Sequence, residues 1–357
     1  MENDPRLAYL QAHGDFSSAY STLDPGLRSF LVPGVGYQAY AVQGRRVMGL
    51  FNPVCADSDR PQLLRSFIKT LRPEGIFQVD GETAHGYQDL GLRTHRFGME
   101  TVIMLDRFQL SGAPMRMVRE ACNRGRRLGY EIAEIGREIA ASPATWARLQ
   151  DVSHQWLATR IVKTREIGVL IRRSVFAPED GCRKFVLLDP AGEIKGYQVY
   201  DPIFRQGSIA GYSLTFARFA QDRLKGHHYF MTVAVLGRLR KEDCGRIELG
   251  LSPLYKVMEE DPLNASGLLP RLMNLVYQHG GRLYGFKGLA LHKRKYRGTE
   301  YPAYLATPRR IPLSALFGLI RLTGLLGRAR SPVEKPLASL TAADFSRRGL
   351  RRRPSGP

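Results

Sequence analysis

Residues 281–306, GRLYGFKGLALHKRKYRGTEYPAYLA, bring aromatic rings, cations and glycines together in one short stretch. The aromatic members Tyr284, Phe286 and Tyr296 are interleaved with Lys287, Lys293, Arg294, Lys295 and Arg297. Because rings stack on bases or acyl groups while cations meet phosphates, this pattern is typical of a site for a phosphate-rich ligand. A solvated basic turn between two strands explains the same composition equally well.

The length and charge of the chain indicate how many domains it has and what kind of partner it binds. Its 357 residues predict roughly two domains, and a hydrophobic content of 43% is enough for packed interiors. The 53 Lys and Arg residues exceed the 33 Asp and Glu residues, for a net charge of +20. Residues 292–357 alone hold 15 of the cations and only three of the acids. This balance predicts a polyanionic partner: nucleic acid, an anionic membrane, or both.

The cysteines and the chain ends predict no special compartment or metal. Cys55, Cys122, Cys182 and Cys244 are far apart and form no CxxC pair, which argues against a zinc site or a disulfide framework. The first residues show no basic segment followed by an apolar run, so we expect no signal peptide. The most apolar long segment, residues 311–327, is interrupted by Arg321. We therefore expect a cytoplasmic protein without a metal.

The first part of the chain predicts alternating strands and helices. The expected elements are strands at 28–42 and 46–52 around a turn at Gln43-Gly44, a helix at 61–71 with Asp59 as its N-cap, a strand at 75–79 followed by a turn at Asp80-Gly81, and a strand at 101–105. This succession predicts a layered domain of mixed α and β structure.

A basic amphipathic helix is predicted at residues 114–130. Met117, Val118, Ala121 and Cys122 form its apolar stripe, whereas Arg119, Asn123, Arg124, Arg126 and Arg127 form a cationic face. Gly129 is the expected C-cap. Two interpretations stay open: a solvated face whose cations suit the helix dipole, or a face that grips phosphates.

A second α/β unit follows a predicted helix at 142–159, which has Ser142 as N-cap and Pro143 at its first position. The unit's expected elements are a hairpin of strands 184–188 and 193–200 around the turn Asp189-Pro190-Ala191-Gly192, a strand at 208–216, a helix at 227–241, a strand at 246–250 and a helix at 268–277. The two halves thus repeat a similar order of elements.

Four stretches, in order along the chain, carry a resemblance to a known family. They are residues 32–52; residues 91–110, with Gly91-Leu92, Phe97-Gly98-Met99-Glu100 and Leu105-Asp106; the helix with Arg119, Asn123, Arg124, Arg127 and Gly129; and LGLSPL at 249–254, followed by Tyr284, Phe286, Lys293, Lys295-Tyr296 and Tyr304-Leu305-Ala306. Together they span about residues 30–308. On these stretches the chain resembles the cytosolic domain of bacterial phosphatidylglycerol lysyltransferases, the multiple peptide resistance factor family, which also occurs as a free-standing domain.

The resemblance implies an α+β fold with two tandem GNAT-like acyltransferase domains joined by a helix. The boundaries we expect are 1–141 for the N-terminal domain, 142–160 for the connecting helix, 161–308 for the C-terminal domain, 309–330 for an amphipathic basic helix and 331–357 for a disordered basic tail. The implied reaction moves an aminoacyl group from a charged tRNA to a lipid headgroup or a small-molecule acceptor. Its ester donor is already activated, so aminoacyl-tRNA is the co-substrate and no cofactor is expected.

The resemblance also implies site residues. The implied catalytic residues are Lys293, Lys295, Glu100 and His228, and the implied residues for binding substrate or tRNA are Arg119, Asn123, Arg127, Tyr284, Phe286, Lys287, Ser213 and Arg218. Surface lysines, helix packing and a structural salt bridge are the alternative explanations of these residues. Ser213 and the pair His227-His228 stand in stretches where the lipid enzymes carry acids, which leaves the acceptor open.

Two alternatives concern the place and the kind of activity. Residues 309–330 either lie on an anionic membrane, as in a peripheral enzyme at the inner face of the cell membrane, or pack on the domain while the acceptor is soluble. The competing functions are an acyltransferase with a donor other than tRNA, and a non-catalytic basic protein that binds membrane or nucleic acid.

Overall fold

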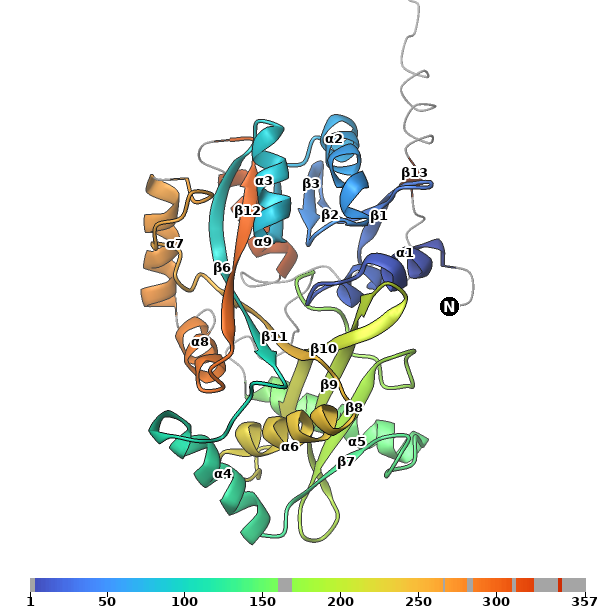
Figure 1. Cartoon of the computed structure of the whole chain (residues 1–357), viewed down its shortest axis with the longest axis vertical. Helices are drawn as coiled ribbons and strands as arrows, with labels where there is room; N and C mark the ends of the chain where they lie inside the picture. Colours follow the sequence, from blue (N-terminus) through green and yellow to red (C-terminus); the bar gives the residue numbers. More distant parts are fainter. Residues whose placement is uncertain are drawn as a thin grey trace, which may run out of the picture.

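The computed structural model describes residues 4–159, 169–265, 267–280, 285–309, 313–323 and 340–341 (Figure 1). Its strands form one 13-stranded sheet in which β4 (Val54–Cys55) pairs with β2 at the side of the main path. The spatial order along the main path is β13 (Leu340–Thr341), β1 (Arg28–Val32), β2 (Gly36–Gln43), β3 (Arg46–Leu50), β5 (Gly75–Val79), β12 (Thr299–Thr307), β6 (Arg93–Met104), β11 (Arg246–Pro253), β10 (Ser208–Phe219), β9 (Ile194–Arg205), β8 (Arg183–Leu188) and β7 (Glu131–Glu134).

One sequence of elements occurs twice along this sheet. In the first half, the antiparallel pair β2–β3 leads through α2 (Arg60–Leu71) to β5, which runs parallel to β3. In the second half, the antiparallel pair β9–β10 leads through α6 (His227–Lys241) to β11, which runs parallel to β10. The mixed α and β class and the repeated order predicted from the sequence are therefore confirmed, whereas the division into two GNAT-like domains stays a prediction.

The two halves share the strands at the centre of the sheet. β6 pairs with β12 over Arg93 to Val102 and with β11 over Gly98 to Met104, so it belongs to both halves. β12 comes from the end of the predicted C-terminal domain, yet it lies between β5 and β6 of the first half (Figure 1). Because the sheet is continuous, it does not test the predicted boundaries at residues 141, 160 and 308.

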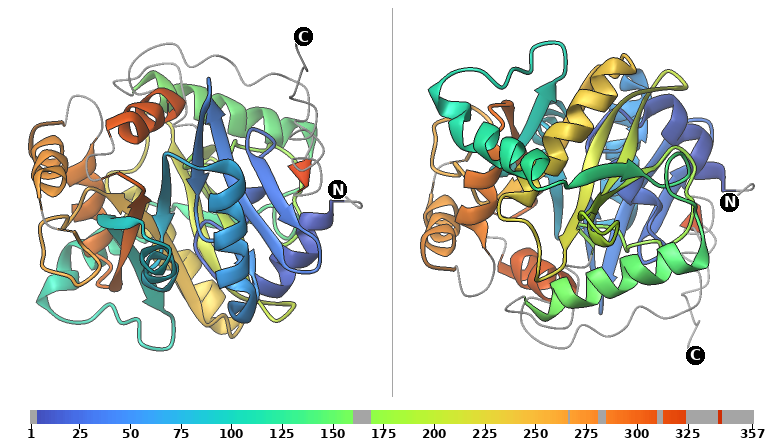
Figure 2. Two further views of the ribbon diagram at one scale, coloured as in Figure 1. Left: turned by 90° about the horizontal axis from the view of Figure 1, so that it is seen from above. Right: turned by 90° about the horizontal axis from the view of Figure 1, so that it is seen from below.

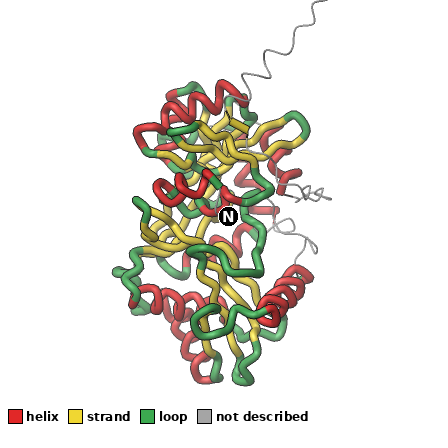
Figure 3. The backbone as a smooth tube through the Cα atoms, turned by 90° about the vertical axis from the view of Figure 1, so that its right-hand side faces the viewer, coloured by secondary structure: helices red, strands yellow, loops and turns green. Residues whose placement is uncertain are grey.

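Helices cover both faces of the sheet because its strands carry apolar side chains on both faces. Alternate residues of β8 illustrate this: Phe185 and Leu187 pack in one apolar cluster with α6, whereas Val186 packs in another with α5 (Pro143–Ala158). Figure 2 shows the strands of this half between α6 on one side and α5 on the other. The side view in Figure 3 shows the same layering of helices outside strands. The helix α5 and its cap are as predicted, since the Ser142 hydroxyl accepts from the Thr145 amide at 3.2 Å.

One of the open interpretations and two local predictions differ from the structure. Residues 281–306 are not a solvated basic turn throughout, because they contain helix α8 (Phe286–Arg294), whose one face is buried. The single strand predicted at 28–42 is two strands, β1 and β2, which pair with each other in antiparallel fashion. The turn expected at Asp80-Gly81 instead begins helix α3 (Gly81–Asp89), because the Asp80 carboxylate accepts from the Thr83 amide at 2.8 Å as an N-cap. In both helices a glycine stands at the start, where a turn was considered: α3 begins at Gly81 and α8 begins directly after Gly285.

The predicted basic helix at 309–330 is described only as α9 (Leu313–Thr323). Ala315 and Leu319 are buried in the apolar cluster that includes Met48 of β3, and an added Cβ at Gly318 would lie 2.7 Å from the Met48 sulfur. This part of the helix therefore packs on the sheet, as the second alternative expects, whereas the soluble acceptor in that alternative stays a prediction. Within the ranges described, no helix is both long and apolar enough to cross a membrane. The predicted tail lies outside the described residues except for β13, which pairs with β1.

Candidate active site

A bulge in β11 shapes the place where the two halves of the sheet meet. In its pairing with β6, Glu248 lies opposite Val102 and Leu251 lies opposite Glu100, so β11 contains one extra residue between these pairs. Gly250 takes a left-handed backbone conformation there, with φ of +69°, which glycine adopts without steric cost. Bulges of this kind bend a strand and redirect its groups, and this one directs the Leu251 carbonyl oxygen toward α8.

Lys293 of α8 reaches that carbonyl. Its ammonium donates to the Leu251 oxygen at 2.8 Å, and the residue is only 7% exposed. Because burial disfavours the charged amine, the pKa of Lys293 is lowered to about 7, although the carboxylate of Glu100 acts in the opposite direction. A lysine that exchanges its proton near neutral pH is suited to acid–base chemistry.

Glu100 lies on β6 beside the bulge, between β11 and β12. Its two carboxylate oxygens accept from Ser17 Oγ at 2.7 Å and from Gln78 Nε2 at 2.8 Å. Burial raises the pKa of Glu100, while these two hydrogen bonds and the charge of Lys293 lower it. The structure thus brings together two of the predicted catalytic residues, Glu100 and Lys293.

Glu248 is a third buried ionisable group here, and it was not among the residues predicted from the sequence. It accepts from Arg246 Nε at 2.8 Å, and burial raises the pKa of Glu248 to about 7. Glu100 contributes to this shift by charge repulsion. The available signal was an acid within the apolar strand RIELGL, two residues from an arginine and hence on the same face of the strand. The predicted residue Ser213 is also buried and pairs with Glu248 across β10 and β11.

Histidines connect α8 with the start of α6. The rings of His228 and His292 lie 5.1 Å apart, and those of His227 and His228 lie 3.9 Å apart. Burial lowers the pKa of His227 and of His292 to about 4, so both are neutral at pH 7. Because His292 precedes Lys293, these contacts place the predicted residue His228 at the end of α8 that carries Lys293.

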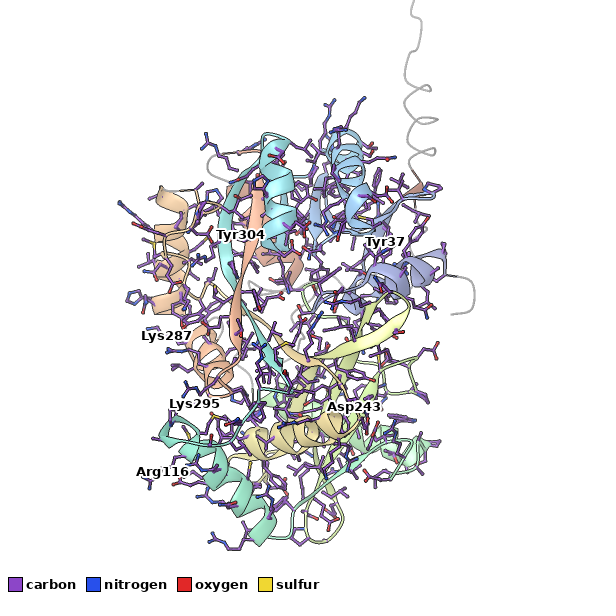
Figure 4. The ribbon with its side chains drawn as sticks, viewed as in Figure 1. Tyr37, Arg116, Asp243, Lys287, Lys295 and Tyr304 are labelled. Atoms are coloured by element: carbon purple, nitrogen blue, oxygen red, sulfur yellow. The ribbon has the colours of Figure 1, made fainter. Side chains whose placement is uncertain are left out.

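The other predicted residues lie in several places. Lys287 is exposed on α8 and Lys295 is half-buried just beyond the helix, and both are labelled in Figure 4. Arg218 and Phe286 are buried: the guanidinium of Arg218 lies over the rings of Trp156 and Phe216 and binds Ser153, and Phe286 belongs to an apolar cluster. Packing explains these two positions. Tyr284 lies outside the described residues.

The hydrogen bonds described for the cationic face of α4 (Arg116–Arg127) do not involve Lys293. Arg119 donates to the carbonyl oxygens of Leu110 and Gly112, each at 2.7 Å, and so holds the preceding loop. Asn123 and Arg127 are exposed. The two interpretations of this face, solvated surface or phosphate-binding surface, both fit these positions.

A groove of about 780 Å³ lies between α4 and α6. Its walls include Phe108, Leu110, Val233 and Leu236, and Arg126 and Lys241 also line it. Lys293, Glu100 and Glu248 do not line it, so this groove and the cluster of buried ionisable groups are different features. We place the candidate site at the cluster because it gathers buried ionisable groups around the bulge, with Lys293 bonded to the Leu251 carbonyl and Glu100 held by Ser17 and Gln78. Burial shifts the pKa of Lys293 and of Glu248 to about 7. Among the residues described, no group of three His, Cys, Asp or Glu side chains is arranged to hold a metal ion.

The sequence is similar to proteins of known name. The profile of a family described as phosphatidylglycerol lysyltransferase, C-terminal, matches residues 7–307. The phosphatidylglycerol lysyltransferase of Bacillus subtilis (strain 168) is 23% identical over 294 residues, which are 80% of this chain and 32% of that protein. The lysylphosphatidylglycerol biosynthesis bifunctional protein LysX of Mycobacterium marinum is 23% identical over 71% of this chain and 23% of its own length. The chain thus spans about a third or less of these two relatives.

Two solved structures show the same fold. L-PGS from Bacillus licheniformis superimposes with a TM-score of 0.76 and 22% identity, over 92% of this chain and 98% of that chain. A C-terminal domain named for a lysylphosphatidylglycerol synthetase of Agrobacterium fabrum gives a TM-score of 0.72 and 22% identity, over 90% and 96% of the two chains. At this level of identity the likeness shows the architecture and does not identify the substrate.

Proposed function

The chain belongs to the phosphatidylglycerol lysyltransferase C-terminal family, and from this premise we propose that it transfers an aminoacyl group from a charged tRNA to the hydroxyl of a phosphatidylglycerol-like lipid headgroup. The Bacillus subtilis relative is a phosphatidylglycerol lysyltransferase by name, which supports a transferase. The net charge of +20 supports a polyanionic donor and an anionic acceptor.

The reaction requires one proton transfer and no oxidation. The acceptor hydroxyl oxygen attacks the ester carbonyl carbon of the aminoacyl-tRNA, and a new carbon–oxygen bond forms. The bond from that carbon to the ribose oxygen then breaks, and the proton of the acceptor passes to the ribose oxygen. Because the ester is already activated, the enzyme must mainly position both substrates, move this proton and stabilise the oxyanion.

The observation that carries the proposal is the burial of Lys293 against the Leu251 carbonyl oxygen, 2.8 Å from its amine, because this burial lowers the pKa of Lys293 to about 7. In its neutral form the amine accepts the proton from the acceptor hydroxyl. The resulting ammonium stabilises the oxyanion and returns the proton to the ribose oxygen. A lysine on the surface would be almost fully protonated at neutral pH and could not accept a proton in this way.

Glu100 has a second role in this proposal. An aminoacyl ester carries an α-ammonium group, and a carboxylate held by Ser17 and Gln78 beside Lys293 is a suitable partner for it. The same carboxylate acts on the charge of Lys293. We propose that Glu100 binds the amino group while Lys293 handles the proton.

The lipid acceptor is tested by extracting the lipids of cells with and without the protein and analysing them by mass spectrometry. The proposal expects a phosphatidylglycerol species whose mass is increased by one aminoacyl residue, present only with the active protein. The Lys293→Gln variant at equal abundance is the matched control and should lack it. Identical lipid profiles in all three strains, together with transfer to a soluble acceptor in extracts, would favour the soluble-acceptor alternative.

A further inference from the structure

Helix α7 (Leu268–His279) exposes leucines on the side that does not pack on the protein. Leu269 and Met273 are buried in the apolar cluster below it. On the other side, Leu268 is 64% exposed and Leu275 is 55% exposed, and Leu272 between them is exposed as well. Spacings of four and three residues place these leucines along one face of the helix. Contiguous exposed apolar side chains of this size mark an interaction surface.

The adjacent helix α8 also exposes a leucine beside cations. α7 and α8 are in contact, and they lie next to each other at one edge of the molecule (Figure 1). Leu291 of α8 is 55% exposed. Its helix neighbours Lys287 and Arg294 are exposed cations, as is Arg271 on α7, and Figure 4 shows Lys287 at the outer edge of the molecule.

The charge of this surface indicates what it contacts. Neither α7 nor α8 contains a single Asp or Glu residue, so no carboxylate on these helices offsets Arg271, Lys287 and Arg294. Leucines flanked by cations fit the boundary between headgroups and acyl chains of an anionic bilayer, where the cations meet phosphates and the leucines enter the apolar layer. A nucleic acid would use the cations but would leave the leucines in water. α9, in contrast, turns Ala315 and Leu319 toward the sheet.

We propose that the exposed face of α7 and α8, formed by Leu268, Leu272, Leu275 and Leu291 with Arg271, Lys287 and Arg294, docks on an anionic lipid bilayer. This inference rests on the proposed function only in the choice of a lipid acceptor. Since α8 also carries Lys293 on its buried side, docking through its outer face brings the candidate site to within one helix diameter of the headgroups, which is about 10 Å.

The proposal is tested by cosedimentation of the full chain with vesicles of phosphatidylglycerol and phosphatidylcholine, and with vesicles of phosphatidylcholine alone. We expect binding to the anionic vesicles that the double variant Leu268→Gln/Leu275→Gln weakens by about tenfold or more, since each leucine withdraws apolar area from water. The matched control is Phe317→Gln, because Phe317 is 46% exposed but lies on α9. It should bind as the unchanged chain does. Equal thermal unfolding temperatures would show that all three proteins are folded.

Three outcomes would overturn the inference. The first is equal vesicle binding by the double variant and the unchanged chain, and the second is loss of binding in Phe317→Gln alone. The third is that the unchanged chain forms a dimer without lipid and the double variant is a monomer. Aminoacyl transfer to a short-chain, water-soluble phosphatidylglycerol separates this inference from the proposed function. The double variant should retain that activity. If the unchanged chain binds vesicles through the leucines but transfers nothing, the docking surface stands and the proposed function fails.

Discussion

Lys293 donates from α8 to the carbonyl oxygen of Leu251 over 2.8 Å, and Leu251 lies opposite Glu100 in the pairing of β11 with β6. A helix, a bulged strand and the central strand of the sheet therefore meet at one buried amine. The bulge lies directly before Leu251 in β11, and bulges of this kind change the direction of the groups that follow them. Burial of this amine, which donates to one carbonyl oxygen and feels the charge of the Glu100 carboxylate, brings its charged and neutral forms close in free energy near pH 7.

The rate of transfer should rise with pH through about 7. The pKa of Lys293 is lowered to about 7, so the neutral amine that accepts the proton is scarce below that pH and abundant above it. We expect kcat/KM to show a rising limb with its midpoint near pH 7. Lys293→Gln should lower kcat by roughly 100-fold or more and remove the limb.

Lys293→Arg is the control for this prediction, because arginine keeps the positive charge but cannot accept a proton near neutral pH. Arginine should fail to restore the rate. If Lys293→Arg is nearly as active as the unchanged chain, the lysine acts only as a cation and not as a base.

Glu100→Gln should move the same limb to lower pH. The Glu100 carboxylate raises the pKa of Lys293 against the effect of burial, so its removal lets burial lower that pKa further. A downward shift of about one unit in the pH profile is expected. KM for the aminoacyl-tRNA should rise in the same variant, because Glu100 is also the proposed partner of the α-ammonium. An upward shift would show that Lys293 and Glu100 do not interact as described.

The stability of the protein should depend on Glu248 between about pH 4.5 and pH 7. Burial raises the pKa of Glu248 from 4.5 to about 7, so the folded state holds this proton more tightly than the unfolded state. Its contribution to the free energy of unfolding is fully present below about pH 4.5 and is lost as the pH rises through 7. Glu248→Gln resembles the protonated form and should flatten this part of the curve.

Lys293 affects the free energy of unfolding in a different pH range, and there the free energy rises with pH instead of falling. Its lowered pKa means that the folded state releases the proton first, so its contribution to stability increases from about pH 7 to pH 10.5. Urea unfolding at pH 5, pH 7 and pH 9 measures both effects. An unchanged slope between pH 5 and pH 7 in Glu248→Gln would mean that Glu248 is ionised in the folded protein throughout this range.

Gly125→Ala should destabilise the packing of α4 on α6. A Cβ at this position would lie 2.6 Å from the ring of Phe230, which is too close for any real contact. Overpacking of this kind costs about 1–3 kcal/mol in the free energy of unfolding. Gly237→Ala on α6 is the matched control, since its Cβ would meet no atom within 4 Å and alanine favours a helix. Equal losses in the two variants would refute the argument.

Local signals in the sequence predict much of this fold. The helix at α6 has the predicted bounds, because a long apolar periodic segment is a strong signal. The β8–β9 turn is also as predicted: Asp189 accepts from the amides of Ala191 and Glu193, and Gly192 takes the left-handed conformation. Ser142 caps α5 for the same kind of local reason.

The pairing of strands that are far apart in the chain could not be predicted from the sequence. Nothing in the composition of residues 299–307 indicates that they enter the sheet between β5 and β6, because strand partners are chosen by contacts far apart in the chain. The candidate site was predictable in part. The resemblance indicated Lys293 and Glu100, but their environment depends on the bulge at Gly250, and Glu248 gains its unusual pKa only from burial.

The most direct test of the central claim is transfer in a purified system. The chain is incubated with phosphatidylglycerol vesicles and total tRNA charged with labelled amino acids, and the label in the chloroform-soluble fraction is measured over time. The account predicts label in the lipid with the unchanged chain, none after ribonuclease treatment of the tRNA, and a rate lower by roughly 100-fold with Lys293→Gln. Absence of lipid label with the folded, unchanged chain, or label that enters the lipid equally well from free amino acids, would contradict it.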